Sequence, residues 1–197
     1  MVGMVEDKIN EIKSYAKENN VPIMMDDGID FLTHYIKENN VKNILEIGTA
    51  VGYSSIKMAL VDNNINVVTI ERDENRYKEA VSNISKMELD KRIKCIFGDA
   101  LEVAIDGLYD LIFIDAAKCQ NIKFFEKFEK LLNENGTIVV DNIYFHNVIF
   151  EDDSKLSRNV RGIKRKILLF IDYVKALDDY EYEIKPIGDG IMIIKRR

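Results

Sequence analysis

Hydrophobic positions along the chain predict an alternation of short strands with helices. Apolar runs typical of buried strands fall at 43–47, 66–71, 93–97, 109–114 and 136–141. Segments that predict helices follow these runs, at about 52–62, 73–87, 99–105 and 118–133. Alternation of this kind is typical of a parallel, doubly wound sheet whose crossovers are right-handed. We therefore expect an α/β fold with a Rossmann-like arrangement.

Both ends of the chain depart from this alternation. Residues 4–19, and a second segment that begins at Asp26, carry apolar side chains at helical spacing. Residues 142–157 show no regular pattern, whereas 158–177 predict a long helix. Two strand-like runs then flank a Gly-Asp-Gly turn at 188–190, which is a hairpin signal. The sequence predicts one domain with a seven-stranded, mostly parallel sheet that ends in an antiparallel hairpin.

Composition narrows the class of protein. The chain has 197 residues, 47% hydrophobic and 31% charged, which fits one globular domain with a full core. A formal net charge of −6 excludes a protein that binds polyanions over its whole surface. Cys95 and Cys119 form no CxxC pair, so neither a disulfide framework nor a cysteine-rich zinc site is expected. No apolar run approaches the ~20 residues that span a bilayer, and there is no apolar signal core, so we expect a cytoplasmic protein with no membrane partner.

The stretch from Val41 to Ser54 carries the first chemical signal. It reads as a buried strand that runs into a glycine turn and then into a helix. Gly48 and Gly52 permit the backbone to approach a ligand closely, and ligands of open α/β sheets bind beyond the carboxyl ends of the strands. Glu71 ends the next strand, about 20 residues further on, where an acid binds a ribose diol.

The glycine pattern argues against a dinucleotide. It is not GxGxxG, so the second close glycine that a pyrophosphate requires is missing. Glu46 would also place a negative charge where phosphates would lie. A ligand with a ribose, an amino group and no phosphate fits these residues better, and S-adenosylmethionine is such a ligand.

Acidic residues follow five of the predicted strands: Glu46, Glu71, Asp99, Asp115 and Asp141. Parallel strands bring their carboxyl ends to one edge of the sheet, so we expect these acids to share that edge. Each acid alone could simply cap the next helix. Five carboxylates at one edge, however, repel one another unless a cation or hydrogen-bond donors lie among them. The set therefore indicates a binding site more strongly than any single member does.

Six motifs occur in order along the chain: LEIGTAVGYSS, TIERD, FGDAL, DLIFIDAAK, VVDNIYF and GDGIMIIKRR. Together they resemble the cation-dependent O-methyltransferases, the family of the catechol and caffeoyl-CoA enzymes, from about Val21 to the C-terminus. The VPIM segment and the basic stretch after the DN motif are most similar to bacterial enzymes that methylate 5-hydroxyuridine at the tRNA wobble position. The resemblance implies an S-adenosylmethionine-dependent enzyme and a homodimer. Residues 1–40 would then cap the cofactor site and form a candidate dimer contact, and residues 41–197 would form the methyltransferase core.

The same resemblance implies a set of cofactor-binding residues. Glu46 and Gly48 would hold the methionine end of S-adenosylmethionine, with Ser54 nearby. Glu71 would bind the ribose, the FGDAL motif would meet the adenine, and the VPIM segment would close over the cofactor. The full set is Ile23, Met24, Glu46, Gly48, Ser54, Glu71, Asp99, Ala100 and Asp115.

A metal site and a base are also implied by the resemblance, with Asp115, Asp141 and Asn142 as ligands and Lys118 as the general base. These ligands offer only oxygen, which suits Mg²⁺, with Mn²⁺ or Ca²⁺ as competitors. The metal would chelate two neighbouring oxygens of the substrate and lower the pKa of the hydroxyl to be methylated. A lysine beside a dication can serve as a base near neutral pH. The alternative for Lys118 is a solvated lysine in the first turn of a helix.

Two kinds of acceptor fit the same chemistry, because 5-hydroxyuridine can chelate a metal through its hydroxyl and carbonyl as a catechol does. Residues 154–166 hold six Lys or Arg and no acid, and Arg158, Arg161 and Arg165 fall on one helical face. Such a face supplies phosphate contacts in nucleic-acid binding, although it is also typical of a solvated helix. Tyr144 follows the DN motif in a loop that could rim the substrate pocket.

We therefore expect methylation of the wobble 5-hydroxyuridine to 5-methoxyuridine, with the anticodon region of tRNA as the partner. The alternative acceptor is a small catechol or a caffeoyl-CoA-like molecule. Outside the enzymes, the alternative is a catalytically silent RNA-binding module on the same fold. A base beside a set of metal ligands argues against that module, because a pure binder needs neither. His146 and Cys119 receive no role.

Overall fold

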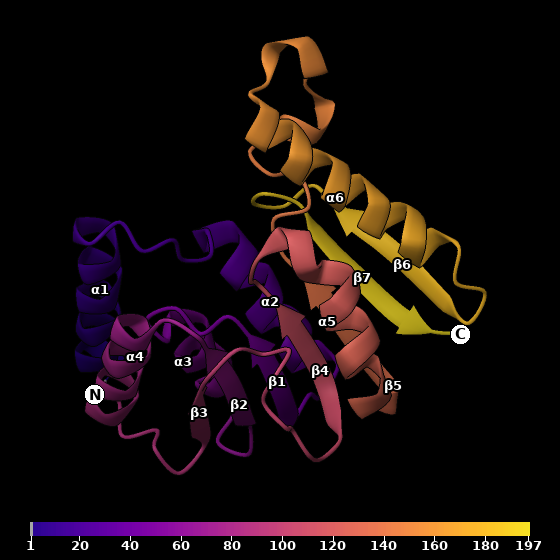
Figure 1. Cartoon of the computed structure of the whole chain (residues 1–197). Helices are drawn as coiled ribbons and strands as arrows, with labels where there is room; N and C mark the ends of the chain where they lie inside the picture. The colour runs from indigo at the N-terminus through magenta and orange to yellow at the C-terminus, as the bar shows by residue number, and fades with distance from the viewer. Residues whose placement is uncertain (1) are drawn as a thin grey trace.

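A seven-stranded sheet forms the centre of the molecule (Figure 1). The computed structural model describes residues 2–197. The strands are β1 (Asn43–Ile47), β2 (Asn66–Glu71), β3 (Ile93–Phe97), β4 (Tyr109–Ile114), β5 (Leu132–Val140), β6 (Tyr180–Lys185) and β7 (Ile191–Arg196). Their order across the sheet is β3-β2-β1-β4-β5-β7-β6. β7 pairs antiparallel with both of its neighbours and the other pairs are parallel, so the predicted fold class is confirmed.

Helices cover both faces of the sheet. Within residues 2–197 they are α1 (Val2–Glu18), α2 (Asp26–Glu38), α3 (Tyr53–Ala59), α4 (Glu74–Lys86), α5 (Asn121–Phe128) and α6 (Arg158–Lys175). Ile12, Leu32 and Ile56 from the first three helices are buried in one core cluster. Phe128 of α5 and Phe170 of α6 belong to a second cluster on the opposite face. The chain therefore folds as a three-layer sandwich of helices, sheet and helices.

The central strand β1 shows why an unbroken apolar run was required. Ile44 faces the first core cluster and Leu45 faces the second, and both are fully buried. A parallel strand that is covered on both faces must be apolar at successive positions, rather than at alternate ones. Glu46, in the same strand, is buried as well, and the parallel register with β2 sets it opposite Thr69.

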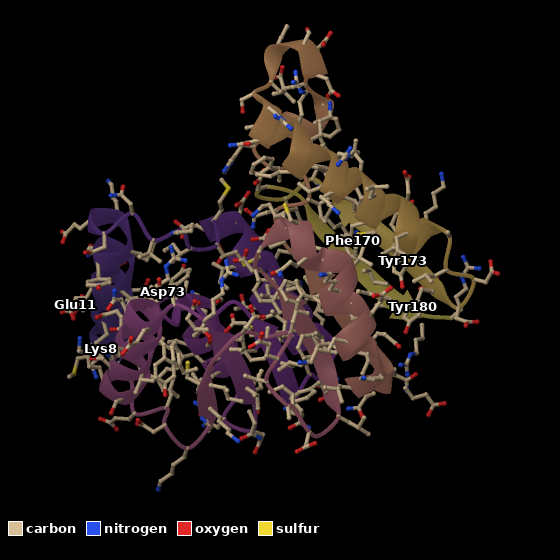
Figure 2. All side chains as sticks on the ribbon, viewed as in Figure 1. Lys8, Glu11, Asp73, Phe170, Tyr173 and Tyr180 are labelled. Atoms are coloured by element: carbon tan, nitrogen blue, oxygen red, sulfur yellow. The ribbon has the colours of Figure 1, made fainter. Side chains whose placement is uncertain are left out.

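Aromatic packing fixes α6 against the C-terminal part of the sheet. The ring of Phe125 on α5 lies 6.5 Å from that of Phe170, 5.9 Å from that of Tyr173 and 5.3 Å from that of Tyr180, between ring centres. Figure 2 labels three of these side chains, where α6 meets β6. Edge-to-face pairs of this kind stabilise packing beyond the area that they bury. The basic helix is thus anchored at its C-terminal half.

The prediction of a helix over 99–105 is wrong. The segment forms turns instead, and the Asp99 side chain accepts a local hydrogen bond from the amide of Leu101. A predicted helix over 118–133 is also too long. α5 ends at Phe128 and gives way to a single 3-10 turn, after which β5 begins at Leu132. Local hydrogen bonds of Asp compete with helix formation, and the sequence pattern does not register them.

Two irregular parts of the chain lie near the carboxyl edge of the sheet. Residues 19–25 join α1 to α2, and residues 142–157 lead from β5 to α6 through two short 3-10 turns. The second segment projects above the body of the molecule and carries the start of α6 with it (Figure 1). The predicted roles of residues 1–40, as a cap and as a dimer contact, stay predictions. Among the helices of residues 2–197, none is long and apolar enough to cross a membrane.

Candidate active site

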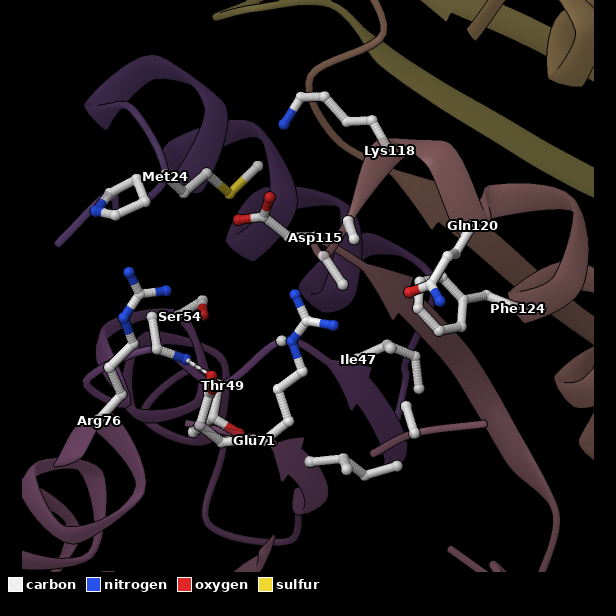
Figure 3. A pocket seen from close by; sticks show the side chains of 18 of the residues that line it. Met24, Ile47, Thr49, Ser54, Glu71, Arg76, Asp115, Lys118, Gln120 and Phe124 are labelled. Carbon is white, nitrogen blue, oxygen red and sulfur yellow. Dashed lines mark hydrogen bonds between the residues drawn. The ribbon is translucent and has the colours of Figure 1, made fainter. Parts of the chain in front are cut away.

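A cavity of about 310 Å³ opens at the carboxyl ends of β1, β2 and β4 (Figure 3). This is the place where the strand order reverses, and it is where open α/β sheets bind ligands. Ten of the predicted site residues line it: Ile23, Met24, Gly48, Ser54, Glu71, Asp99, Ala100, Asp115, Lys118 and Asn142. The structure therefore brings the predicted cofactor residues and the predicted reaction residues into one cavity.

The glycine loop after β1 ties three strand ends together. The amides of Gly48 and Thr49 both donate to the carbonyl of Ile70, at distances of 3.1 and 3.2 Å. Gly48 has a φ of +102°, and a Cβ atom there would lie 2.1 Å from the carbonyl oxygen of Asp115. No other residue fits this contact without moving the backbone, so Gly48 sets the distance between the loop and the end of β4.

Glu71 lies at the wall of the cavity and braces the loop. Its side chain is buried, and its two oxygens accept from the amides of Ala50 and Asp73, each at 2.8 Å. A carboxylate oxygen has a second lone pair, so each atom retains capacity for one further donor. Two such oxygens suit a ribose diol, which is the role predicted for this residue.

Glu46 is a predicted cofactor residue that does not line the cavity. Its carboxylate is fully buried and accepts hydrogen bonds from the hydroxyls of Ser54 (2.5 Å), Ser55 and Thr69 (2.6 Å). Burial raises the pKa of Glu46 to about 7, against the lowering effect of these hydroxyls, and the Asp115 carboxylate adds to the rise. The structure thus places Glu46 behind the wall, where it fixes Ser54. A direct contact with the cofactor stays a prediction.

Asp115 and Asn142 line the other end of the cavity, whereas Asp141, the third predicted metal ligand, is buried beside them and is not part of the lining. The Asn142 side-chain amide lies 3.2 Å from Asp115 Oδ1, and its backbone amide donates to Asp141 Oδ1 at 2.8 Å. Asn142 has a φ of +63°, and the amide of Ile143 after it donates to the carbonyl of Gly190, in the turn before β7. Burial raises the pKa of both carboxyls, and the Asp115 charge raises that of Asp141 further. Two acids therefore lie close enough here to repel each other.

A hard divalent cation fits this donor set. Two carboxylates and one amide offer oxygen ligands alone, which Mg²⁺, Mn²⁺ and Ca²⁺ prefer. A cation would also relieve the repulsion by which the Asp115 charge raises the pKa of Asp141. Within residues 2–197, no cluster of three or more His, Cys, Asp or Glu forms a metal site, so the metal stays a prediction that rests on this mixed set.

Lys118 begins the 3-10 turn that follows β4, three residues after Asp115. Its side chain lines the cavity and extends over the same mouth as the Asp115 carboxylate (Figure 3). The Lys118 ammonium lies 5.9 Å from the ring centre of Phe145, in the loop that follows Asn142. A base in this position can reach a substrate hydroxyl that enters from the mouth.

The predicted substrate residues lie outside the cavity. Arg158, Arg161 and Arg165 are all exposed along the first two turns of α6. The guanidinium of Arg161 donates to the carbonyl of Asp153 at 3.2 Å. Tyr144 packs over the turn before β7, where a Cβ on Gly190 would come within 2.6 Å of its ring. These side chains could meet only a substrate larger than the cavity.

Residues 4–197 match the sequence profile of a family described as O-methyltransferase. The chain belongs to this O-methyltransferase family.

Several relatives support the assignment. Caffeoyl-CoA O-methyltransferase 2 of Populus trichocarpa is 30% identical over 166 residues, which cover 78% of this chain and 66% of that protein. A Staphylococcus aureus structure, solved as a candidate caffeoyl-CoA O-methyltransferase, has a TM-score of 0.91 and 37% identity, covering 96% of this chain and 92% of that one. An O-methyltransferase of Bacillus cereus, solved with S-adenosylhomocysteine, has a TM-score of 0.83 and 26% identity, with coverages of 97% and 91%.

The predicted enzyme class, an S-adenosylmethionine-dependent O-methyltransferase, is thereby confirmed. The type is that of the caffeoyl-CoA and catechol enzymes, which both occur among the curated relatives. The resemblance that the motifs indicated is confirmed at this level. The tRNA acceptor and the metal stay predictions.

Sequence reasoning missed two arginines of the methyltransferase that line the cavity, Arg72 and Arg76. Both follow Glu71 within five residues: Arg72 lies in the turn that leads from β2 into α4, and Arg76 lies in the first turn of α4. The acid at the end of β2 could have indicated these arginines, because the helix that follows β2 begins beside the ligand that the acid binds. The motif alone could not show that the third residue of α4 turns its side chain toward the loop after β1.

Proposed function

We propose that this methyltransferase transfers the methyl group of S-adenosylmethionine to a hydroxyl that has a second oxygen beside it, with the help of a divalent cation, first of all Mg²⁺. One observation carries the proposal: Glu71, Ser54, Asp115, Lys118 and Asn142 line a single cavity. A methyl donor and an acceptor that share one cavity can be held in register, and such positioning accounts for much of the rate of bimolecular transfer.

The proposed residue roles give the cofactor one direction in the cavity. Glu71 would bind the ribose, and the loop around Asp99 and Ala100 would enclose the adenine. Gly48 and Ser54 would hold the methionine end. S-Adenosylmethionine supplies an electrophilic methyl group when it is bound there.

The chain's own residues would prepare the acceptor. Asp115, Asp141 and Asn142 would hold the cation, which when bound lowers the pKa of the acceptor hydroxyl and aligns its neighbouring oxygen. Lys118 would take the proton from that hydroxyl. Met24 and Pro22, on the opposite wall of the cavity, would exclude water from the reacting atoms.

We propose the wobble 5-hydroxyuridine of tRNA as the first acceptor. Arg158, Arg161 and Arg165 support it, because they are exposed on the projecting part of α6 (Figure 1). This helix follows the segment 142–157, which begins at the cavity residue Asn142. Cations in such a row contact phosphates and leave base recognition to the cavity. A small catechol or caffeoyl-CoA-like acceptor is the second candidate, and the names of the curated relatives favour it.

Incubation with labelled S-adenosylmethionine and Mg²⁺ tests the ranking. The acceptors are tRNA that carries 5-hydroxyuridine, the same tRNA without that modification, and a panel of catechols with caffeoyl-CoA. We expect label in the 5-hydroxyuridine tRNA alone. Label in catechols or caffeoyl-CoA alone would reverse the order of the two candidates.

A charge reversal separates the RNA surface from the cavity. Arg161→Glu with Arg165→Glu should lower tRNA methylation at least about tenfold at physiological salt, because each lost phosphate contact weakens binding. The affinity for S-adenosylhomocysteine should not change. The matched control is Lys91→Glu with Lys94→Glu, two exposed lysines at the far end of the sheet near the start of β3. Equal losses in both pairs would contradict a specific RNA surface.

A further inference from the structure

Asp189 lies in the turn between β6 and β7 and is hydrogen-bonded twice to the chain that leaves β5. Its backbone carbonyl accepts from the amide of Tyr144 at 2.8 Å, and its Oδ1 atom accepts from the amide of His146 at 2.5 Å. The turn and the segment after β5 therefore lie side by side (Figure 1). Through these two bonds Asp189 holds the residues on both sides of Phe145.

The segment that Asp189 holds has an uncommon backbone. Phe145, His146 and Asn147 have φ values of +48°, +55° and +62°. Residues other than glycine rarely adopt this left-handed conformation, and they keep it only where the surrounding structure supports it. The hydrogen bond from the His146 amide to Asp189 lies in the middle of the run, so it is part of that support.

The second carboxylate oxygen of Asp189 has no partner. Oδ2 is buried without a hydrogen bond in the part of the chain that the structure describes, and His146 Nδ1 lies 3.6 Å away, beyond hydrogen-bond distance. The side chain is only 8% exposed, so water offsets little of the cost of burying it. A buried carboxylate with one donor costs stability, which points to a role other than stability.

Phe145 connects the held segment to the reaction end of the cavity. The Lys118 ammonium lies 5.9 Å from the centre of the Phe145 ring, within the range of a cation–π contact. A lysine side chain has many rotamers, and a ring that attracts its ammonium reduces the positions that the nitrogen occupies. The place of this ring depends on the backbone of residues 144–146.

We propose that Asp189 is a positioning residue for the general base: it fixes residues 144–146, so that the Phe145 ring restrains Lys118 at the mouth of the cavity. The inference rests on the proposed role of Lys118 as the base. Asp189 does not line the cavity, so it acts through the segment and not on the reacting atoms. Its loss should lower the rate of transfer and leave cofactor binding unchanged.

The charge of Asp189 gives an alternative route to the same site. The carboxylate lies near enough to Asp141 to raise the pKa of that acid further. Asp189→Asn separates the two routes, because it removes the charge and keeps an oxygen that accepts from the His146 amide. Asp189→Ala removes both the charge and the acceptor.

Methyl transfer and hydrogen exchange of these two variants test the proposal. Asp189→Ala should lower kcat about 3- to 30-fold, the range of a cation–π contact, and should speed exchange of the His146 amide. Asp189→Asn should keep kcat within about twofold and should keep the slow exchange. The affinity for S-adenosylhomocysteine should stay within about twofold in both. The matched control is Asp178→Ala, at an exposed acid in the turn before β6, which should change none of these quantities.

Two further variants show whether Asp189 acts through Phe145 and Lys118. In the Lys118→Met background, Asp189→Ala should lower the remaining rate less than twofold, because the side chain that it positions is gone. Phe145→Leu should lower kcat by the same 3- to 30-fold without changing exchange of the His146 amide. This variant also keeps the proposal testable if melting temperatures show that Asp189→Ala is unfolded.

Three results would overturn the positioning role of Asp189. Equal losses of kcat in Asp189→Asn and Asp189→Ala would assign the effect to charge. Multiplied losses in the double variant would show that Asp189 does not act through Lys118, and an unchanged kcat in Phe145→Leu would exclude the ring. If the unaltered protein methylates none of the acceptors, the proposed function fails and the base role fails with it. Unchanged exchange in Asp189→Ala would instead overturn only the hold on the segment.

Discussion

The two ends of the cavity differ in how the chain treats its acids. At the cofactor end, Glu46 accepts from three hydroxyls and Glu71 accepts from two backbone amides. At the reaction end, Asp115 and Asp141 share Asn142 as their donor. Burial raises the pKa of both carboxyls, and the Asp115 charge raises that of Asp141 further. The first pair is satisfied by the fold. The second pair is of the kind that a cation stabilises.

This difference teaches how one site can hold a cofactor and also activate an acceptor. Acids that the chain already satisfies act as rigid parts and keep the loop after β1 in shape. Two carboxylates that repel each other are stabilised when a cation binds between them. Four variants test this contrast. Three of them alter a residue at one end of the cavity, and Gly48→Ala alters the contact that joins the two ends.

Lys118→Met should have the largest effect, and on the reaction end alone. Loss of a general base lowers a rate by about 10²–10⁴-fold. The affinity for S-adenosylhomocysteine should stay within about twofold, because the loss falls on the transition state. The comparison variant is Lys123→Met, an exposed lysine on α5. If the methyl-transfer rate fell less than tenfold, or if the cofactor affinity fell in parallel with the rate, Lys118 would not be the general base.

Gly48→Ala should disturb both ends at once. The added Cβ would lie 2.1 Å from the carbonyl oxygen of Asp115, in a left-handed conformation. Crowding and backbone strain together should lower the free energy of unfolding by about 3 kcal/mol or more. Gly162→Ala in α6, where no atom lies within 4 Å of the new Cβ, should instead stabilise the protein by about 0.5–1 kcal/mol. Urea denaturation measures both, and equal outcomes would contradict the contact.

Asp141→Asn should relieve repulsion at the reaction end. In a chelating buffer at pH 8, the variant should melt about 2–4 °C above the unaltered protein, which corresponds to about 1 kcal/mol. MgCl₂ should raise the melting temperature of the unaltered protein and not that of the variant. The control is Asp178→Asn, at an exposed acid. It should not raise the melting temperature in chelator, and it should keep the response to MgCl₂. A variant that melts lower in chelator and still responds to Mg²⁺ would contradict the pairing of Asp115 with Asp141.

Glu46→Gln should change how stability depends on pH. A carboxyl whose pKa is raised to about 7 in the folded state stabilises the fold fully below its unfolded pKa near 4.5, and this contribution is lost as the pH rises to about 7. The free energy of unfolding should therefore fall less steeply between pH 5 and 8 in the variant. The raised pKa values of Asp115 and Asp141 also make the free energy of unfolding depend on pH. The curve of the variant should therefore be less steep than that of the unaltered protein, but not flat. Two parallel curves would show that Glu46 does not titrate in this range.

Much of the fold follows from local pattern. The apolar runs that predicted strands 43–47, 66–71, 93–97 and 109–114 coincide with β1 to β4. Strands β1, β2 and β4 lie inside the sheet and are largely apolar because both of their faces are covered, whereas the edge strand β3 exposes Lys94 and Phe97. The boundary between α5 and β5 could not be predicted in this way, because an apolar residue such as Leu132 is compatible with both a helix and a strand. Pairing with Tyr109 of β4 decides that it is a strand residue.

The site shows the same limit. Motifs predicted which acids gather at the edge, yet the role of Glu46 depends on partners from two other elements. Ser54 and Ser55 come from α3, and Thr69 faces Glu46 only through the register of β1 with β2. Arg76 was missed for a similar reason, because its position depends on how α4 packs beside the loop. Chemistry that depends on tertiary register cannot be read from spacing along the chain.

Metal dependence of each end tests the central contrast most directly. Protein freed of metal by a chelator is titrated with MgCl₂, and methyl transfer to tRNA carrying 5-hydroxyuridine and to catechols is measured alongside the affinity for S-adenosylhomocysteine. We expect transfer to appear only as Mg²⁺ is added, while the affinity for S-adenosylhomocysteine stays within about twofold. Full transfer in the chelator, or a cofactor affinity that itself depends on Mg²⁺, would contradict a reaction end that is distinct from the cofactor end.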